Sequence, residues 1–293
     1  MESVAAQQGP DGFFVAKIHS DPAFLPQYTK SGPACQEQSA LAKKGRIRYT
    51  GTAAPTGILK GAMSAVVKTI FLDLDDTLLD FQQAERQALS RTLRHFQIDP
   101  APAVLDRYHE INRQQWELLE EGKLTRSQVL TRRFDLLFGE LGMECSSAEV
   151  RDIYEMHLSR GHFFIPGAPE LLAELAPRYD LYLASNGTAA VQAGRIESAG
   201  IARYFKDIFI SEKMGANKPS PAYFQSCFDA IPDFDPAAAL VVGDSLTSDI
   251  RGARNAGLRS CWFNPKGLPP RPDIPADYTI RALAELPPLL ERL

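Results

Sequence analysis

Two aspartates, Asp73 and Asp75, directly follow an apolar, β-branched run at residues 66–72. Residues two apart on an extended chain project to the same side, so both carboxylates can face one site. Carboxylates this close repel each other unless a cation or a proton separates them. The pair therefore predicts a metal site or an acid/base pair, although acidic turns after strands are also common without such a role.

A second pair of carboxylates, Asp244 and Asp249, follows another apolar run at residues 239–242 and the turn residue Gly243. A buried strand, a glycine turn and two carboxylates five residues apart can hold Mg²⁺ with oxygen ligands and water. The alternative is that Asp249 only complements the dipole in the first turn of a helix.

Two further elements could hold a phosphoryl group. Ser185 and Asn186 follow the run 181–184, where a hydroxyl group and exposed backbone N–H groups at the start of a helix can bind phosphate oxygens. Lys218 lies in a loop stiffened by two prolines, and a fixed ammonium group offsets negative charge that develops on phosphate. Taken singly, the first element is more typical of a plain helix cap and the second of a solvated loop.

The elements that carry these residues alternate between apolar runs and helical segments. The runs at 66–72, 181–184, 208–210, 239–242 and 260–263 predict strands that are buried on both faces of a parallel sheet. This alternation predicts an α/β fold with a doubly wound parallel sheet, which binds ligands at the carboxyl ends of its strands. All four elements whose residues could take part in chemistry lie at or just past such ends, so we expect them to form one site.

One connection is far longer than a strand–helix–strand crossover of about 30 residues. Between the first two strands, the sequence has the apolar spacing of three helices, at 105–119, 127–141 and 148–158. We therefore expect a helical cap domain inserted into an α/β core. The predicted boundaries are 82–163 for the cap and 63–81 with 164–293 for the core.

Residues 1–62 differ from the rest of the chain, because Gln, Gly, Pro, Ser and Ala are common and no helical or strand period is sustained. Seven Lys and Arg against four Asp and Glu give this stretch a net charge of +3, unlike the acidic remainder. We interpret it as an N-terminal extension that is disordered or lies upstream of the natural start at Met63. A functional tail is the alternative.

Bulk composition narrows the class of partner. With 44% hydrophobic residues, 23% charged residues and a net charge of −4, the chain resembles an ordinary globular protein without a broad basic surface, so we expect no nucleic-acid partner. No apolar run approaches the roughly 20 residues of a membrane span, and no signal pattern is evident, so we expect no membrane contact and a cytoplasmic location. The four cysteines lie far apart and are interpreted as reduced thiols.

Over residues from about 66 to 265, the order of the motifs resembles the haloacid dehalogenase (HAD) superfamily. The motifs are Asp-x-Asp-x-Thr, a serine after a strand, Lys-Pro, and Gly-Asp-x-x-x-x-Asp. The helical insert after the first motif is similar to the C1 cap of that superfamily. The resemblance implies a phosphatase that works through a phosphorylated aspartate and uses Mg²⁺.

The resemblance also implies roles for single residues. Asp73 would be the nucleophile and Asp75 the general acid and base, while Ser185, Asn186 and Lys218 would hold the phosphoryl group. The metal ligands would be Asp73, the backbone carbonyl of Asp75 and Asp244, with Asp249 in support.

The cap and the loops facing it would select the leaving group. The segments 108–116, 121–125 and 261–264 look like the bacterial pyrimidine 5′-nucleotidases of the superfamily, which implies a nucleoside monophosphate such as UMP, dUMP, dTMP or a non-standard analogue. Asn112 and Trp116 lie one helical turn apart and could offer an amide to a base edge and an indole that stacks on the base. Alternatively, Trp116 packs in the cap core and Asn112 is solvated.

Other functions stay open at this point. A phosphatase of phosphoglycolate or of a sugar phosphate, or a phosphomutase, fits the core motifs equally well. A haloacid dehalogenase shares the fold but needs neither Asp75 nor Asp244, and a non-catalytic binding module would not need these intact motifs. The oligomeric state is left open between monomer and homodimer.

Overall fold

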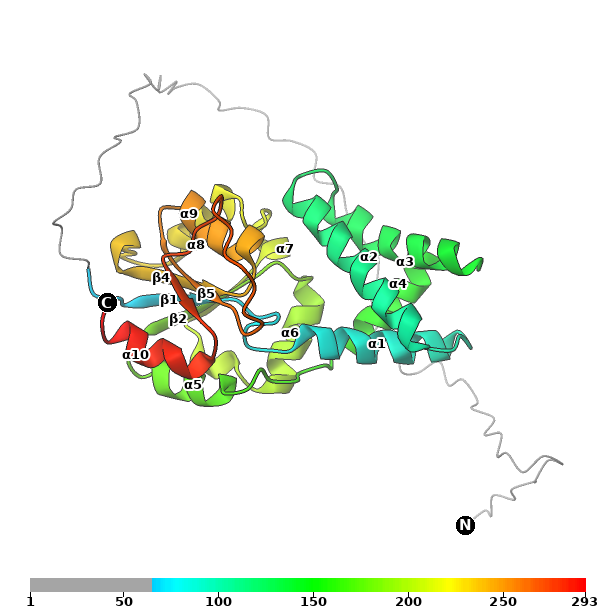
Figure 1. The fold of residues 1–293 in the computed structure, drawn as a ribbon, viewed down its shortest axis with the longest axis horizontal. Coiled ribbons are helices and arrows are strands. Elements are labelled where there is room, and N and C mark those ends of the chain that lie inside the picture. The colour runs from blue at the N-terminus through cyan, green and yellow to red at the C-terminus, as the bar shows by residue number, and fades with distance from the viewer. Residues whose placement is uncertain (1–64) are drawn as a thin grey trace, which may run out of the picture. The chain divides into compact units, whose positions relative to one another are not determined.

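A computed structural model of the chain describes residues 65–293 (Figure 1). The predicted extension at 1–62 lies outside the described residues. Six parallel strands form one sheet in the order β3-β2-β1-β4-β5-β6. The strands are β1 (Thr69–Leu72), β2 (Asp180–Ser185), β3 (Asp207–Ile210), β4 (Ala239–Gly243), β5 (Arg259–Phe263) and β6 (Tyr278–Ile280).

Helices cover both faces of this sheet. Successive side chains of a strand point to opposite faces, so a continuous apolar strand makes both faces apolar. Ile70 and Leu72 of β1 belong to the apolar core on one face, and Phe71 belongs to the core on the other. The first face is covered by α5 (Ala168–Leu175), α6 (Ala189–Ala199) and α10 (Leu286–Leu290). The second face is covered by α8 (Pro221–Ala230) and α9 (Arg251–Asn255). This arrangement confirms the predicted doubly wound α/β fold.

Strand β1 lies at the centre of the sheet, between β2 and β4. The register pairs Leu72 with Leu183 on one side and with Val242 on the other, so the three strands end within two residues of one another. Asp73 follows directly and donates its backbone N–H to the carbonyl of Val242 at 2.9 Å. The carboxyl ends of β1, β2 and β4 therefore open toward one crevice, where such sheets bind ligands.

Of the five helices between β1 and β2, the first four form what we call the helical bundle. They are α1 (Phe81–His95), α2 (Pro102–Glu120), α3 (Arg126–Leu141) and α4 (Ser147–Leu158). Figure 1 shows them gathered beyond α6, away from the strands. The bundle has its own apolar core, which includes Leu89, Tyr108, Phe134 and Tyr154. The three predicted helices are confirmed as α2, α3 and α4, whereas the cap boundaries 82 and 163 stay a prediction.

The two links between the bundle and the sheet pair with each other. The N–H of Asp80 donates to the carbonyl of Phe163 at 2.8 Å, and the N–H of Ile165 donates to the carbonyl of Leu78 at 3.0 Å. Leu79 and Phe164 form an antiparallel bridge between these contacts. Both links therefore run side by side, and a movement of the bundle would bend them together.

Two bulk predictions can be compared with the described part of the chain. Cys145, Cys227 and Cys261 are free thiols, and Cys35 lies outside residues 65–293. Among those residues, every helix is too short or too polar to cross a membrane.

Candidate active site

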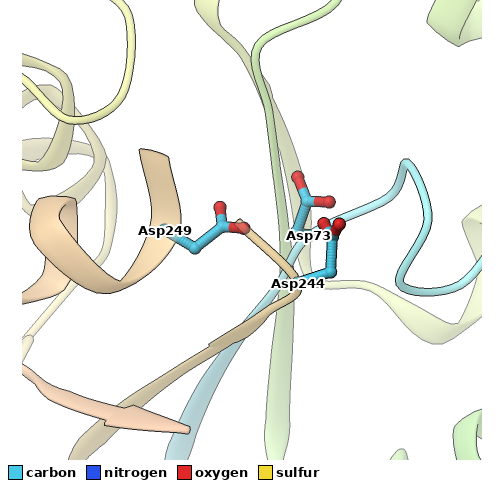
Figure 2. A group of neighbouring side chains, drawn as sticks. All are labelled: Asp73, Asp244 and Asp249. Atoms are coloured by element: carbon cyan, nitrogen blue, oxygen red, sulfur yellow. The ribbon is translucent and has the colours of Figure 1, made fainter. Parts of the chain in front are cut away.

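Three carboxylates converge at the carboxyl edge of the sheet, as Figure 2 shows. Asp73 follows β1, Asp244 follows β4, and Asp249 lies in a π-helical turn at Leu246–Ile250. One carboxylate oxygen of each aspartate lies within 4.8 Å of the others. Oxygen atoms at this spacing can serve as ligands of a hard divalent cation.

The turn after β4 aims Asp249 at this cluster. A Cβ atom at Gly243 would lie 2.2 Å from Oδ2 of Asp249, so only glycine allows the carboxylate to approach the strand end. Ser245 caps the turn, because its hydroxyl accepts the N–H of Ser248 at 3.1 Å. The N–H of Ser245 in turn donates to Oδ2 of Asp249 at 3.1 Å.

The backbone of Asp244 is held on both sides. Its N–H donates to the hydroxyl of Thr77 at 3.1 Å, and its carbonyl accepts the indole N–H of Trp262 at 2.8 Å. Thr77 is the threonine of the first sequence motif, so the motifs that follow β1 and β4 are hydrogen-bonded to each other. The carboxylate of Asp244 itself accepts no hydrogen bond from any residue at 65–293.

Lys218 is the buried cation of the site. Its Nζ lies 2.6 Å from Oδ1 of Asp73 and 2.6 Å from Oδ1 of Asp249, and it also donates to the carbonyl of Ala184. Asn186 holds the lysine backbone, since its Oδ1 accepts the N–H of Lys218 at 2.8 Å and its Nδ2 donates to the carbonyl at 2.9 Å. The structure therefore brings Asn186, Lys218 and the aspartates together, as the motif positions predict.

Three carboxylates facing one ammonium group leave the site with excess negative charge. Burial raises the pKa of Asp73 to about 8, with Asp249 and Asp75 adding repulsion and Lys218 opposing the rise. Burial, followed by the charges of Asp73 and Asp249, also raises the pKa of Asp244 well above its ordinary range. Burial works against the charge of Lys218, but Asp249 and Asp73 outweigh it and raise the lysine pKa. A divalent cation would offset this excess charge.

The oxygen atoms without a partner indicate how a cation fits. Within residues 65–293, no hydrogen bond reaches the carboxylate of Asp244, Oδ2 of Asp73 or the backbone carbonyl of Asp75. Both carboxylate oxygens of Asp249 are engaged, one by Lys218 and one by Ser245. The donor set therefore suits Mg²⁺, with the first three residues free for direct contact and Asp249 better placed to support them.

The side chain of Asp75 turns toward α6 rather than toward the three aspartates. Its Oδ2 accepts from Nε2 of Gln192 at 2.6 Å, and its Oδ1 contacts Nη1 of Arg195. The same Gln192 amide donates to the hydroxyl of Ser185 at 2.8 Å. Sequence analysis missed Gln192 and Arg195, because polar residues on a helix are typical of its solvated face. Their spacing of three, one turn beyond the serine motif, is the signal that could have found them.

A cavity of about 420 Å³ extends from the aspartates to the helical bundle. Asp73 and Lys218 line it at the sheet, and Trp116, Glu155 and Leu158 line it from the bundle. This volume lies in the range of about 300–1,000 Å³ that is usual for small-molecule sites.

The sequence predicts that two bundle residues, Asn112 and Trp116, contact substrate. Both line the cavity, but their side chains are not equally available to a ligand. Asn112 is buried, and its Nδ2 donates to Glu85 at 2.6 Å. Its Oδ1 accepts from Arg133 and from the indole N–H of Trp116, each at 3.1 Å. The amide of Asn112 is therefore used within the bundle, where it fixes the indole ring.

Arg126, at the start of α3, is a further residue that sequence analysis missed. Its Nη1 donates to the carbonyls of Asn186 and Gly187 at 3.0 and 2.9 Å, and its Nη2 contacts the side chains of Ser211 and Asn217. One guanidinium group thus joins the bundle to the loops that follow β2 and β3.

The fold and the site together define a hydrolase with an acidic active site on a doubly wound α/β core. Residues 67–257 match the model of the haloacid dehalogenase-like hydrolases, and the chain belongs to this family. This confirms the resemblance found in the sequence motifs.

Three relatives are informative. The HAD-hydrolase YfnB of Bacillus subtilis is 41% identical over 75% of this chain and 93% of its own. The pyrimidine 5′-nucleotidase PynA of Streptococcus pneumoniae is 34% identical over 77% and 95%, and the glyceraldehyde 3-phosphate phosphatase of Pyrococcus furiosus is 31% identical over 77% and 94%. The crystal structure of YfnB, bound to magnesium and revealing interdomain movement, matches with a TM-score of 0.74 and covers 76% of this chain and 98% of that chain.

Proposed function

We propose that this protein is a Mg²⁺-dependent phosphomonoesterase that works through a phosphorylated Asp73. The observation that carries the proposal is the contact of Lys218 with Asp73 at the edge of an acidic cluster with excess negative charge. Such a site favours a divalent cation and, with it, an anionic substrate. The nucleotidase and phosphatase relatives support a phosphate ester as that substrate.

Asp73, the carbonyl of Asp75 and Asp244 would hold Mg²⁺, with Asp249 supporting the lysine and the turn. When bound, the ion offsets the repulsion between the Asp73 carboxylate and the phosphoryl group. The magnesium-bound structure of YfnB supports this assignment.

The remaining steps belong to the side chains of this chain. Asp73 forms a bond to phosphorus as the ester oxygen leaves, and Asp75 gives that oxygen a proton. Asp75 then takes a proton from the water that hydrolyses the aspartyl-phosphate. Ser185, the free backbone N–H of Asn186 and Lys218 hold the phosphoryl oxygens through both steps.

For the leaving group we propose a pyrimidine nucleoside. Trp116 lines the cavity and its ring is fixed by Asn112, so it can stack on a base without losing side-chain freedom. The pyrimidine 5′-nucleotidase PynA supports this choice. A sugar phosphate is the second candidate, because the Pyrococcus furiosus relative acts on glyceraldehyde 3-phosphate.

The helical bundle would then act as the cap over the substrate, with the boundaries predicted above. Since the structure of YfnB reveals interdomain movement, we propose that the bundle moves relative to the sheet about its two paired links. A cytoplasmic location and a monomeric or homodimeric state stay predictions.

The mechanism is tested by replacing the nucleophile. We expect Asp73→Asn to fold but to show no measurable hydrolysis of p-nitrophenyl phosphate or UMP, because an amide cannot attack phosphorus. The wild-type protein should lose its activity with EDTA and regain it with Mg²⁺. Substantial turnover by Asp73→Asn would refute the aspartyl-phosphate mechanism.

The leaving group is tested by a panel of UMP, dUMP, dTMP, phosphoglycolate and sugar phosphates. We expect Trp116→Ala to lower kcat/KM for UMP by about 5- to 100-fold, the loss of one base–aromatic stack, with little change for phosphoglycolate. Trp116→Phe is the matched control, since it keeps an aromatic ring but also lacks the N–H that Asn112 accepts. Equal losses on both substrates in Trp116→Ala would rule out base stacking.

A further inference from the structure

We propose that Arg195, acting with Gln192, is the positioning residue for Asp75 and connects it to the two links of the helical bundle. This inference rests on the proposed function, in which Asp75 is the general acid and base.

The contacts of Asp75 come from one face of α6. Nη1 of Arg195 donates to Oδ1 of Asp75 and to Oε1 of Gln192, the latter at 2.9 Å. Nε2 of Gln192 donates to Oδ2 of Asp75 at 2.6 Å. Both oxygens of the carboxylate are therefore held, and the two α6 side chains also hold each other.

Gly187 makes room for this arrangement. A Cβ atom at position 187 would lie 2.4 to 2.5 Å from side-chain atoms of Gln192, which is closer than real Cβ contacts. The Gln192 amide can thereby reach Ser185 and Asp75 together. The group that holds Asp75 is thus built into the loop that would hold phosphate.

Arg195 also lies against residues that adjoin both links of the bundle. Its Nε donates to the carbonyl of Gly161 at 3.0 Å, next to the second link. Its guanidinium carbon lies 5.6 Å from the ring centre of Phe81, which follows the first link. One rigid guanidinium group therefore contacts Asp75 and the chain on either side of the bundle, so bundle movement and the orientation of Asp75 are coupled.

Stability alone does not account for Arg195. Its side chain is 0% exposed, and its Nη2 has no hydrogen-bond partner among the described residues. A buried, incompletely paired charge is costly, and apolar replacements of such groups are often neutral or stabilising. A fixed cation beside Asp75 has a use in the reaction, because it keeps this carboxylate away from the acidic cluster and directed to the leaving oxygen.

The experiment compares two leaving groups. p-Nitrophenolate departs without a proton, whereas the 5′-oxygen of UMP needs one from Asp75. In Arg195→Met we expect kcat for UMP to fall about 100-fold with KM within about threefold of wild type. With p-nitrophenyl phosphate, we expect a rapid burst of one equivalent of p-nitrophenolate followed by slow turnover, because only hydrolysis of the aspartyl-phosphate then needs Asp75.

A double-mutant cycle separates positioning from structure. If Arg195 acts through Asp75, Arg195→Met has no further effect on turnover of p-nitrophenyl phosphate in an Asp75→Asn background. The proposal would be overturned if the two substitutions together lowered turnover by the product of their separate effects. It would also be overturned if Arg195→Met gave no burst. Arg195→Lys should recover only part of the activity, since an ammonium group cannot reproduce the fork that reaches both Asp75 and Gly161.

Controls keep each result interpretable. Arg203→Met removes an exposed arginine that contacts only Tyr204 and should leave both substrates unaffected. If Arg195→Met does not fold, Gln192→Leu gives the same test, and it should show the same fall in kcat for UMP and the same burst with p-nitrophenyl phosphate. A wild-type protein without Mg²⁺-dependent hydrolysis would instead refute the proposed function itself.

Discussion

At the scale of single residues, the site is governed by unequal pairing of its charges. Lys218 bonds to Asp73 and Asp249, and no cationic side chain at residues 65–293 forms an ion pair with Asp244. Asp244 is also surrounded by other carboxylates, whose charges add to the effect of burial and raise its pKa. Burial and the neighbouring carboxylates therefore both oppose ionisation of Asp244 when no divalent cation is bound.

This penalty predicts an unusual effect of Asp244→Asn. In EDTA at pH 8, we expect the variant to be more stable than wild type by about 1 kcal/mol or more, because an unpaired buried charge is removed. Mg²⁺ should stabilise wild type but not the variant. Thermal unfolding with EDTA and with Mg²⁺ measures both effects, and Asp229→Asn, a change of an exposed carboxylate on α8 that accepts from Gln225 of the same helix, serves as the control.

The raised pKa values at this site also set the direction in which the stability of the metal-free protein changes with pH. Burial raises the pKa of Asp73 from 3.8 to about 8, so the folded state binds more protons than the unfolded state between these values. Stability of the metal-free wild type is then present at low pH and lost as pH rises toward 8. An Asp244→Asn variant that is less stable than wild type in EDTA and still responds to Mg²⁺ would contradict this account.

The convergence of Asp73, Lys218 and Asp244 was predictable, because each follows a strand end and parallel strands end at one edge. The partners of Asp75 were not. Gln192 and Arg195 lie more than a hundred positions away along the chain, and no local spacing indicates that α6 turns this face toward Asp75. The sequence pattern therefore identified the side chains that could react or bind a metal, but it did not identify those that orient them.

At the scale of elements, α3 is joined to the sheet by its first residue, Arg126. Its guanidinium group contacts four oxygens on the segments that follow β2 and β3 and lies 5.6 Å from the ring centre of Trp116. Burial lowers its pKa, but the loop carbonyls and side-chain oxygens satisfy its donors. The start of α3 therefore connects Trp116 with the loop that follows β2.

We expect Arg126→Lys to lower kcat/KM for UMP by about 10- to 100-fold, because a single ammonium group cannot span these acceptors. Arg107→Met is the matched control, since the partners of Arg107 on α2 among residues 65–293 are the exposed Glu110 and Glu140. Exposed ion pairs contribute about 0–1 kcal/mol, so this control should fold and act normally. Unchanged kinetics in Arg126→Lys would show that the loops are held without the bundle.

Elements were predictable in proportion to the strength of their apolar pattern. Strands β1 to β5 are buried, apolar runs, and all five were found from the sequence. Strand β6 has only three residues, and helix α1 buries the small side chains Ala84 and Ala88 among many polar ones. Such weak patterns are decided by packing against neighbours rather than by local sequence.

At the scale of the whole described molecule, a second contact joins the bundle to the sheet. Glu120, near the end of α2, accepts the hydroxyl of Thr247 at 2.9 Å. Burial raises the pKa of Glu120 to about 7, although the hydrogen bond from Thr247 opposes the rise. The nearby charge of Asp249 acts with burial, and Lys218 acts against it. This contact is therefore sensitive to pH near neutrality.

The direction of this pH effect follows from the two protonation states of Glu120. In the proposed movement of the bundle, opening would solvate Glu120 and return its pKa toward 4.5, so the closed arrangement would bind the proton more tightly. Closure is then favoured below about pH 4.5 and loses stability as pH rises through 7.

We expect acrylamide quenching of Trp116 fluorescence to increase between pH 6 and 8, while the buried Trp262 stays shielded. Glu120→Gln keeps an acceptor for Thr247 but cannot ionise, so its quenching should not vary with pH over this range. A variant that opens with pH like the wild type would place the titrating group elsewhere and exclude Glu120 as its cause.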